Sequence, residues 1–253
     1  MNYESQLTLA ISAAQKACVE ILKVYNSRDF EIKSKADNSP LTLADKKAHE
    51  VIIETLKPLG LPILSEEGKA IPYSTRKNWE AFWMVDPLDG TKEFIKRNGE
   101  FTVNIGLIEN QRSVLGVVAV PVTDEIYYGA VGIGAFKILK GHTSRLKNNT
   151  KVDRTKPGIR VVASRSHLNE ETQAFINLLN NPQLVSKGSS LKFMMLADGL
   201  ADIYPRFAPT MEWDTAAAHA VVNQLGIRVM EKDTDHELKY NKENLLNPPF
   251  LVY

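Results

Sequence analysis

The sequence predicts a layered α/β protein, and three observations support this class. Apolar residues recur at helical spacing over residues 5–25 and again from residue 42. Six short apolar runs follow between residues 62 and 139, separated by polar or glycine-containing turns. After residue 158, strand-like and helical runs alternate, as they do in α/β domains. The 253 residues, of which 43% are hydrophobic, suffice for a sizeable core without disulfides.

The first half is predicted to contain two helices followed by a series of strands. The helix over residues 5–25 has an apolar stripe that includes Leu7 and Ile21. A second helix starts near Thr42 and ends at Pro58 and Gly60. Because short turns separate the later runs, we expect antiparallel neighbours among the strands at residues 62–65, 82–86, 101–108, 114–120, 126–131 and 135–139.

The polar segment of residues 140–160 marks a predicted domain boundary. It holds seven Lys and Arg residues against one acid, Asp153, and we interpret it as a surface loop, with attraction of phosphate as the alternative. The chain thus divides into an N-terminal α+β domain over residues 1–140 and a C-terminal α/β domain over residues 141–253. In the second domain we expect strands at 159–163, 183–185, 201–204 and 227–230 and helices at 170–179, 190–197 and 213–225.

Composition and charge exclude several classes of protein. The 31 Lys and Arg residues nearly balance the 30 Asp and Glu residues, so a general nucleic-acid-binding coat is not expected. The single cysteine, Cys18, excludes a disulfide framework and a cysteine-based zinc site, and its place on the first apolar stripe predicts a packing role. We find neither a secretory signal nor an apolar stretch of the ~20 residues that span a bilayer, and therefore expect a cytoplasmic protein.

The segment from Asp86 to Thr91 carries the strongest functional signal. A strand rich in aromatic and branched residues runs into Asp86 and Asp89, and Pro87 and Gly90 then turn the chain sharply. Carboxylates at the C-terminal end of a strand point into a crevice, and a close pair repels unless a cation or a proton lies between them. We expect Gly90 and Thr91 to open a helix whose free amides favour a phosphate. For this segment alone, the alternative is a turn capped by Asp89.

Three further carboxylates lie at the ends of predicted elements. Alone, Glu66 and Glu67 predict a solvated turn, and Asp214 predicts a helix cap. Together with Asp86 and Asp89 they form an all-oxygen cluster without His or Cys, which suits Mg²⁺ or Mn²⁺ and not zinc or copper. Calcium is disfavoured because the EF-hand loop pattern is absent from the sequence.

The segment from Thr42 to Asp45 has two interpretations. Its spacing is that of a capping box, with Asp45 in place of the usual Glu. Alternatively, Asp45 lies near Thr91 and the two orient a water, because a carboxylate–hydroxyl pair generates a nucleophile without a covalent intermediate. The sequence holds no P-loop motif, and residues 132–134 predict a strand turn instead of a dinucleotide fingerprint.

The segment Asp86-Pro87-Leu88-Asp89-Gly90-Thr91 resembles the central motif of the inositol monophosphatase superfamily of Mg²⁺-dependent, lithium-sensitive phosphatases. Residues 66–67 and 213–217 resemble the other two metal segments of that superfamily, in the same order. Residues 34–40, 91–97, 188–193 and 204–207 resemble its bacterial CysQ branch of 3'(2'),5'-bisphosphate nucleotidases. The similarity covers nearly the whole chain, and it implies the αβαβα sandwich of the inositol monophosphatase and fructose bisphosphatase fold.

The resemblance implies a role for each site residue. Glu66, Asp86, Asp89 and the backbone carbonyl of Leu88 would hold Mg²⁺, and Asp214 would complete a second position; roughly two or three Mg²⁺ ions are implied, with Mn²⁺ as a substitute. Asp45 and Thr91, with Glu66, would form the catalytic group that prepares the attacking water. The amides of Gly90 and Thr91 would receive the scissile phosphate. The substrate would contact these residues and those of a nucleotide pocket, namely Ser189, Lys192, Arg206 and His167.

We therefore expect hydrolysis of the 3'-phosphate of adenosine 3',5'-bisphosphate to AMP and phosphate, which by resemblance clears a by-product of sulfate assimilation. A second expected substrate is 3'-phosphoadenylyl sulfate. The alternatives are an inositol-phosphate or sugar-phosphate phosphatase, which shares the metal residues, and a non-catalytic nucleotide or metal sensor. A glycosidase is disfavoured because two carboxylates three residues apart around a turn do not suit a sugar.

The expected partner is a small-molecule nucleotide and not a nucleic-acid polymer, and the sequence predicts no particular oligomeric state. Some members of the family lie at the inner face of the membrane, so the resemblance adds peripheral membrane contact as a second expectation. No basic amphipathic helix in the sequence supports such contact.

Overall fold

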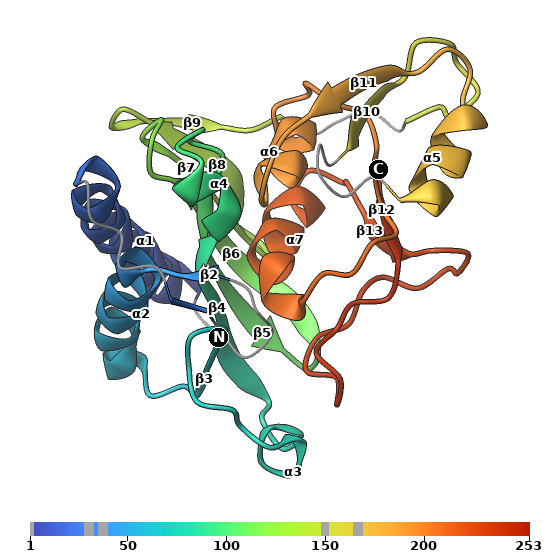
Figure 1. Ribbon diagram of the computed structural model, residues 1–253. Coiled ribbons are helices and arrows are strands. Elements are labelled where there is room, and N and C mark those ends of the chain that lie inside the picture. The colour runs from blue at the N-terminus through green and yellow to red at the C-terminus, as the bar shows by residue number, and fades with distance from the viewer. Residues whose placement is uncertain (1–2, 28–32, 35–39, 148–151, 164–168) are drawn as a thin grey trace.

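The computed structural model describes residues 3–27, 33–34, 40–147, 152–163 and 169–253, and they form five layers (Figure 1). Helices α1 (Tyr3–Asn26) and α2 (Leu43–Leu56) cover one face of a large sheet, and α6 (Leu191–Ala197) and α7 (Ala216–Asn223) cover the other. The smaller strands of the second half follow, and α5 (Glu170–Asn177) lies outside them. This arrangement confirms the predicted layered α/β class and its αβαβα order.

The first two helices have the predicted apolar faces and nearly the predicted ends. In α1 the stripe that includes Leu7 and Ile21 is buried against the sheet, and Cys18 packs beside it. Helix α2 follows Thr42, and a 3₁₀ turn, η1 (Lys57–Leu59), ends at Gly60 with a φ of 69°. A left-handed residue at this place closes the helix end, and glycine adopts it without a side-chain clash.

The large sheet has seven strands in the order β3-β4-β5-β6-β7-β8-β9. All neighbours are antiparallel except β3 and β4, which run parallel. The prediction of antiparallel neighbours is therefore wrong for this first pair, because residues 66–80, which include α3 (Tyr73–Arg76), carry the chain back to the starting edge. The strands are β3 (Ile63–Ser65), β4 (Ala81–Asp89), β5 (Thr102–Glu109), β6 (Arg112–Val120), β7 (Glu125–Ala130), β8 (Gly134–Leu139) and β9 (His142–Arg145).

The second half keeps the predicted alternation and shifts several bounds. The parallel pair β10 (Arg160–Ala163) and β11 (Gln183–Ser186) flanks α5, and a second sheet has the order β12-β14-β13. Its strands are β12 (Tyr204–Arg206), β13 (Val229–Glu231) and β14 (Phe250–Val252). The strand predicted at 201–204 thus begins three residues later and ends two residues later, and the helix predicted at 213–225 is divided into η2 (Glu212–Asp214) and α7.

Four short strands were not predicted as such. Strand β9 lies inside the segment predicted to be a surface loop, so that prediction is wrong at residues 142–145, although all four residues are exposed. A paired sheet edge can hold polar residues, which is why composition alone did not reveal it. The others are β14 and the pair β1 (Lys33–Ser34) and β2 (Pro40–Leu41).

Two glycines allow α7 to lie directly on the large sheet. A Cβ atom at Gly116 would lie 1.9 Å from the backbone oxygen of Ala217, and one at Gly106 would lie 3.1 Å from its nitrogen. Any side chain at Gly116 would therefore push α7 away from β6. Asp214 lies two residues before α7, and the short turn η2 (Glu212–Asp214) that contains it packs against β4 and β5.

In the part of the chain that the structure describes, no helix combines the length and the apolar character needed to cross a membrane.

Candidate active site

Strand β4 brings Asp86 and Asp89 to the candidate site. Its residues are buried from Phe82 to Leu88, and Asp86 is 1% exposed. The pairing with β5 is regular up to Asp86 and is interrupted by a bulge before Asp89. The amide of Leu88 donates to Asp86 Oδ1 at 3.0 Å, which fixes the first carboxylate inside this turn. A bulge re-aims side chains at the end of a strand, and here carboxylate oxygens of Asp86 and Asp89 lie within 4.8 Å of each other.

Asp214 reaches the same place from the second half of the chain. It is the last residue of η2, and its Oδ2 accepts a hydrogen bond from the amide of Met211 at 2.9 Å. One carboxylate oxygen from each of Asp86, Asp89 and Asp214 lies within 4.8 Å of the other two. Asp214 is thus both a cap of its turn, which was one interpretation of the sequence, and a member of the carboxylate cluster.

Glu66 is the fourth acid of the cluster. It directly follows β3, and its amide donates to the carbonyl of Val85 at 3.1 Å, next to Asp86. The Glu66 carboxyl forms a side-chain hydrogen bond with Asp86. The side chain of Glu67 acts on a different residue: its charge raises the pKa of His49 in α2, against the effect of burial.

The electrostatics of the cluster call for a positive charge. Burial raises the pKa of Asp86 well above its ordinary value, and the charges of Glu66, Asp89 and Asp214 raise it further. The pKa of Asp214 is also raised well above its ordinary value, first by burial and then by the charge of Asp89. A cation bound beside such carboxylates would favour their ionised forms. The donor set is entirely oxygen, so the residues present fit a hard divalent cation.

Asp45 and Thr91 lie beside the cluster and in contact with each other. Thr91 Oγ1 lies 3.2 Å from Asp45 Oδ1 and 3.3 Å from the carbonyl oxygen of Leu88, and it can donate its one proton to either. The other oxygen of Asp45 accepts from the amide of Thr42 at 2.8 Å and from its hydroxyl. The capping box is therefore real, and the predicted proximity of Asp45 to Thr91 is confirmed. That the two residues orient a water stays a prediction.

Gly90 allows the chain to turn from β4 into α4 (Thr91–Ile95). Its φ of 94° favours glycine, and a Cβ atom there would lie 3.1 Å from the carbonyl oxygen of Glu100. The amides of Gly90 and Thr91 therefore lie at the start of a short helix, as the sequence predicted. Their contact with phosphate stays a prediction.

Three of the four expected nucleotide-binding residues fall within the described chain. Ser189 adopts a left-handed conformation with a φ of 53°, and its hydroxyl donates to Asp89 Oδ2 at 2.6 Å. Lys192 is buried, and its Nζ donates to the carbonyl oxygen of Ser189 at 2.7 Å. Arg206 Nη2 donates to the carbonyl oxygen of Pro209 at 2.9 Å. His167 lies outside the described residues.

Burial lowers the pKa of Lys192 to about 8. The charge of Asp89 acts in the opposite direction, and the charge of Arg206 lowers this pKa further. The two cations therefore lie near enough to repel each other, and an anion between them would relieve that repulsion.

Sequence reasoning did not find Asn104 and Ser190, although both contact Asp89. Asn104 Nδ2 lies 3.5 Å from Asp89 Oδ2, and the amide of Ser190 donates to the same oxygen at 2.7 Å. A signal for Asn104 existed, because it is the polar residue inside the apolar run of residues 103–108. Ser190 was expected only as the start of a helix.

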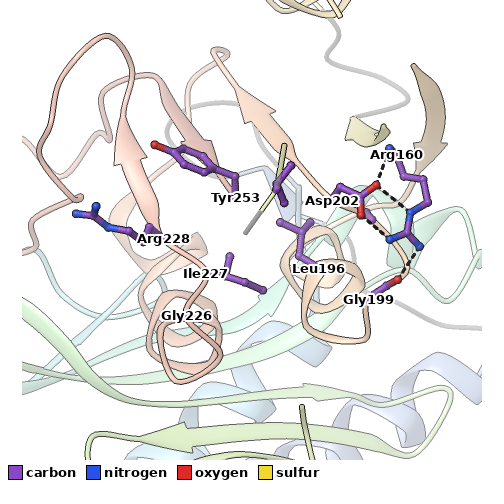
Figure 2. Close-up of a pocket in the computed structure, with 10 residues that line it drawn as sticks. Arg160, Leu196, Gly199, Asp202, Gly226, Ile227, Arg228 and Tyr253 are labelled. Carbon is purple, nitrogen blue, oxygen red and sulfur yellow. Dashed lines mark hydrogen bonds and ion pairs between the residues drawn. The ribbon is translucent and has the colours of Figure 1, made fainter. Parts of the chain in front are cut away.

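A separate cavity of about 460 Å³ lies away from the carboxylates, near the C-terminal ends of α6 and α7 (Figure 2). The cavity is lined by the apolar side chains of Leu196 and Ile227 and by the charged side chains of Arg160 and Asp202. Arg160 donates through Nε and Nη2 to Asp202 and through Nη1 to the carbonyl oxygen of Gly199. The charges of this ion pair therefore compensate each other.

Comparison with known proteins places this fold and site in a family. The chain matches the inositol monophosphatase family over residues 2–249 and belongs to it. A protein named 3'(2'),5'-bisphosphate nucleotidase CysQ from Salmonella typhimurium is 45% identical over 243 residues, which are 94% of this chain and 96% of that protein. The protein of the same name from Haemophilus influenzae is 33% identical over 236 residues, which are 91% and 86% of the two chains.

Solved structures agree. The crystal structure of CysQ from Bacteroides thetaiotaomicron, described as a bacterial member of the inositol monophosphatase family, has a TM-score of 0.87 and 46% sequence identity, and the match covers 99% of this chain and 97% of that one. The suhB protein of Bartonella henselae has a TM-score of 0.78 at 21% identity, covering 98% of this chain and 93% of that one, and shares the fold.

Proposed function

We propose that the protein is a 3'(2'),5'-bisphosphate nucleotidase that hydrolyses the 3'-phosphate of adenosine 3',5'-bisphosphate to AMP and phosphate, a reaction of sulfate assimilation. The observation that carries the proposal is the convergence of Asp86, Asp89 and Asp214, whose carboxylate oxygens lie within 4.8 Å of one another. Relatives that are 45% identical over 94% of the chain and are named for this activity support the choice of substrate. We include 3'-phosphoadenylyl sulfate as a second substrate.

The metal is proposed to be Mg²⁺, with Mn²⁺ as a substitute and roughly two or three ions per site. Glu66, Asp86, Asp89 and Asp214 would hold it, together with the carbonyl oxygen of Leu88. When bound, such ions neutralise phosphate charge, acidify a water and stabilise the leaving oxygen. The raised pKa values of Asp86 and Asp214 support this proposal, because a divalent cation is the partner that would let these buried acids ionise.

Asp45 and Thr91 would activate the attacking water. Because two donors from Thr42 already occupy Asp45 Oδ2, the proton of Thr91 would pass to Oδ1, 3.2 Å away. Thr91 Oγ1 would accept a proton from the water in the same step. The water oxygen then bonds to phosphorus, the bond from phosphorus to O3' breaks, and O3' takes a proton from solvent. Glu66 would assist by fixing the position of Asp86 through the hydrogen bond between the two carboxyl groups.

Lys192 and Arg206 would hold the 5'-phosphate and so select a bisphosphate nucleotide. An arginine can bind phosphate oxygens through two parallel hydrogen bonds, which orients the substrate. Ser189 and His167 would complete this pocket, and the amides of Gly90 and Thr91 would receive the 3'-phosphate. We propose further that residues 1–140 supply most metal ligands and that residues 141–253 supply Asp214 and the nucleotide pocket.

Turnover on matched substrates tests the proposal. Purified protein with Mg²⁺ is assayed for phosphate release from adenosine 3',5'-bisphosphate, 3'-phosphoadenylyl sulfate and myo-inositol 1-phosphate, with a chelator as control. We expect the adenosine bisphosphate to have the highest kcat/KM and the chelator to abolish release. Preference for the inositol phosphate would overturn the nucleotidase assignment. Binding of the nucleotide without any release of phosphate would favour a sensor.

We also propose that the protein works in the cytoplasm as a soluble enzyme. Peripheral contact with the inner membrane face, which the family resemblance suggested, is a separate proposal. Fractionation of cells at low and high salt tests it, because an electrostatically held protein leaves the membrane as salt rises. Recovery of all the protein in the low-salt supernatant would remove membrane contact from the account.

A further inference from the structure

Every hydrogen bond that Asp89 accepts from described residues goes to one oxygen, Oδ2. The Ser189 hydroxyl lies 2.6 Å from it, the Ser190 amide 2.7 Å and the Ser190 hydroxyl 3.1 Å, with Asn104 Nδ2 at 3.5 Å. A carboxylate oxygen has two lone pairs, so these donors saturate Oδ2. Among the described residues, no hydrogen-bond donor reaches Oδ1.

Ser190 and Asn104 also connect Asp89 to the segment of Asp214. Asn104 Nδ2 donates to Ser190 Oγ at 3.0 Å. The one proton of the Ser190 hydroxyl can go either to the carbonyl oxygen of Asp214, 2.8 Å away, or to Asp89 Oδ2, 3.1 Å away. Asn104 and Ser190 are each 1% exposed, so solvent cannot replace these contacts. A chain of hydrogen bonds thus runs from β5 through the start of α6 to η2.

We infer that Ser190 and Asn104 are positioning residues that set the orientation of Asp89 and its separation from Asp214, so that both carboxylates present an oxygen to a divalent cation. This inference rests on the proposed metal site. Outer hydrogen-bond partners orient metal-binding carboxylates, and their loss typically weakens metal affinity by about 10- to 100-fold. Neither residue touches the cation or the reacting atoms, and both act through Asp89 and the Asp214 segment.

Ser190→Ala is the least disruptive variant for a test. The Ser190 side chain makes no capping hydrogen bond to α6, so its removal does not unfold the helix start. The Ser190 amide remains to hold Asp89. Ser113→Ala is a matched control, because Ser113 is also a buried serine and its hydroxyl donates to the carbonyl oxygen of Ala216 at 2.6 Å, one turn from the site, without contact to Asp89.

The affinity of each metal-free variant for Mn²⁺ is measured by titration calorimetry. It is also measured by electron paramagnetic resonance, in which the signal of free Mn²⁺ decreases as the ion binds. We expect Ser190→Ala to raise the Kd for Mn²⁺ by about tenfold, and Ser113→Ala to change it by less than about twofold while both lower the unfolding temperature. A Kd for Ser190→Ala equal to that of the wild type, or equal losses in both variants, would overturn the inference.

A second variant, Asn104→Ala, tests whether the two residues act as one unit. If Asn104 acts through Ser190, removing both side chains should cost little more than removing one. We then expect the Kd of the Ser190→Ala/Asn104→Ala double variant for Mn²⁺ to be within about twofold of that of the weaker-binding single variant. If the increase in Kd of the double variant equals the product of the increases in the two single variants, the shared role would be overturned. Because binding is measured without turnover, a wild type that binds Mn²⁺ but releases no phosphate would refute the proposed function and leave this inference standing. A wild type that binds no Mn²⁺ would refute the inference.

Discussion

The carboxylate cluster and the remote cavity lie at opposite ends of the same two helices. Ser190 and Asp214 precede α6 and α7, whereas the cavity is lined by Leu196 near the end of α6 and by Ile227 beyond α7. In the cavity, a carboxylate and a guanidinium compensate each other. In the cluster, like charges lie close together, and the pKa values of Asp86 and Asp214 are raised by burial and by these charges. The two regions therefore differ in charge: like charges gather at the proposed active site, whereas opposite charges meet at the cavity.

The largest expected difference is in enzyme activity, between a variant that neutralises an acid of the cluster and one that neutralises the acid of the cavity. Asp89→Asn removes a charge that the cation needs, so we expect kcat/KM for adenosine 3',5'-bisphosphate to fall by about 10³-fold or more, roughly 4 kcal/mol. Without metal, the same variant melts at a higher temperature than the wild type, because one like charge leaves the cluster. Phosphate release and thermal unfolding measure both effects.

Asp202→Asn is the matched control, because it removes the acid of the cavity. It keeps activity within about twofold and lowers the melting temperature. Equal losses of activity in Asp89→Asn and Asp202→Asn would contradict the contrast between the two regions.

The pH dependence of stability should report the cluster. The pKa values of Asp86 and Asp214 are raised in the folded chain above their ordinary value of about 3.9, so the folded state binds more protons than the unfolded state above that pH. The free energy of unfolding of the metal-free protein therefore falls as pH rises from about 4 toward the raised values. Mg²⁺ at about 100 times its Kd should restore roughly 2.7 kcal/mol near neutral pH.

Chemical unfolding at several pH values, with Mg²⁺ and with chelator, measures this dependence. An Asp86→Asn variant should show a weaker fall with pH. Stability of the metal-free protein that rises steadily over the same range would contradict the account of the cluster.

Lys192 gives a smaller effect at the edge of the site. Its pKa is lowered to about 8, so the ammonium is charged below that pH and loses its charge above it. If it holds the 5'-phosphate, KM for adenosine 3',5'-bisphosphate should rise by about tenfold between pH 7 and pH 9. Lys192→Met should have a high KM over the whole range. Parallel pH dependences of KM in the two proteins would remove Lys192 from the nucleotide pocket.

The smallest effect is expected at the cavity. Arg160→Ala breaks the ion pair with Asp202, but both side chains are partly exposed, at 37% and 27%. Solvent therefore compensates much of the loss, and we expect about 1 kcal/mol lower stability with unchanged kcat/KM. Chemical unfolding and phosphate release measure the two quantities. A change in kcat/KM of more than about threefold would show that the cavity is coupled to the active site.

Much of the fold could be predicted because hydrophobic periodicity is a local property. The helices at α1 and α2 and the strands β4 to β8 follow directly from it. The parallel pairing of β3 and β4 could not be predicted in this way, because it depends on where the connecting segment returns to the sheet. The division between η2 and α7 likewise depends on packing against β5 and β6 at Gly106 and Gly116.

The residues of the candidate site also differ in how far they could be predicted from local sequence. Asp86 and Asp89 are close in sequence, so their motif was visible. Glu66 and Asp214 were found as carboxylates at the ends of predicted elements, and the resemblance to a family supported them. Asn104 and Ser190 were not found, because their hydrogen bonds to Asp89 join residues that are 15 and 101 positions apart in the chain. A buried polar residue in an apolar strand is the one local signal that such a contact leaves in a sequence.

The most direct test of the central claim is the anomalous diffraction of Mn²⁺ in crystals of this protein grown with the ion. The account predicts at least one strong peak bound by oxygens of Asp86, Asp89 and Asp214, and the loss of that peak in Asp89→Asn. Well-ordered crystals in which Mn²⁺ binds elsewhere, with these three carboxylates left without an ion, would contradict it.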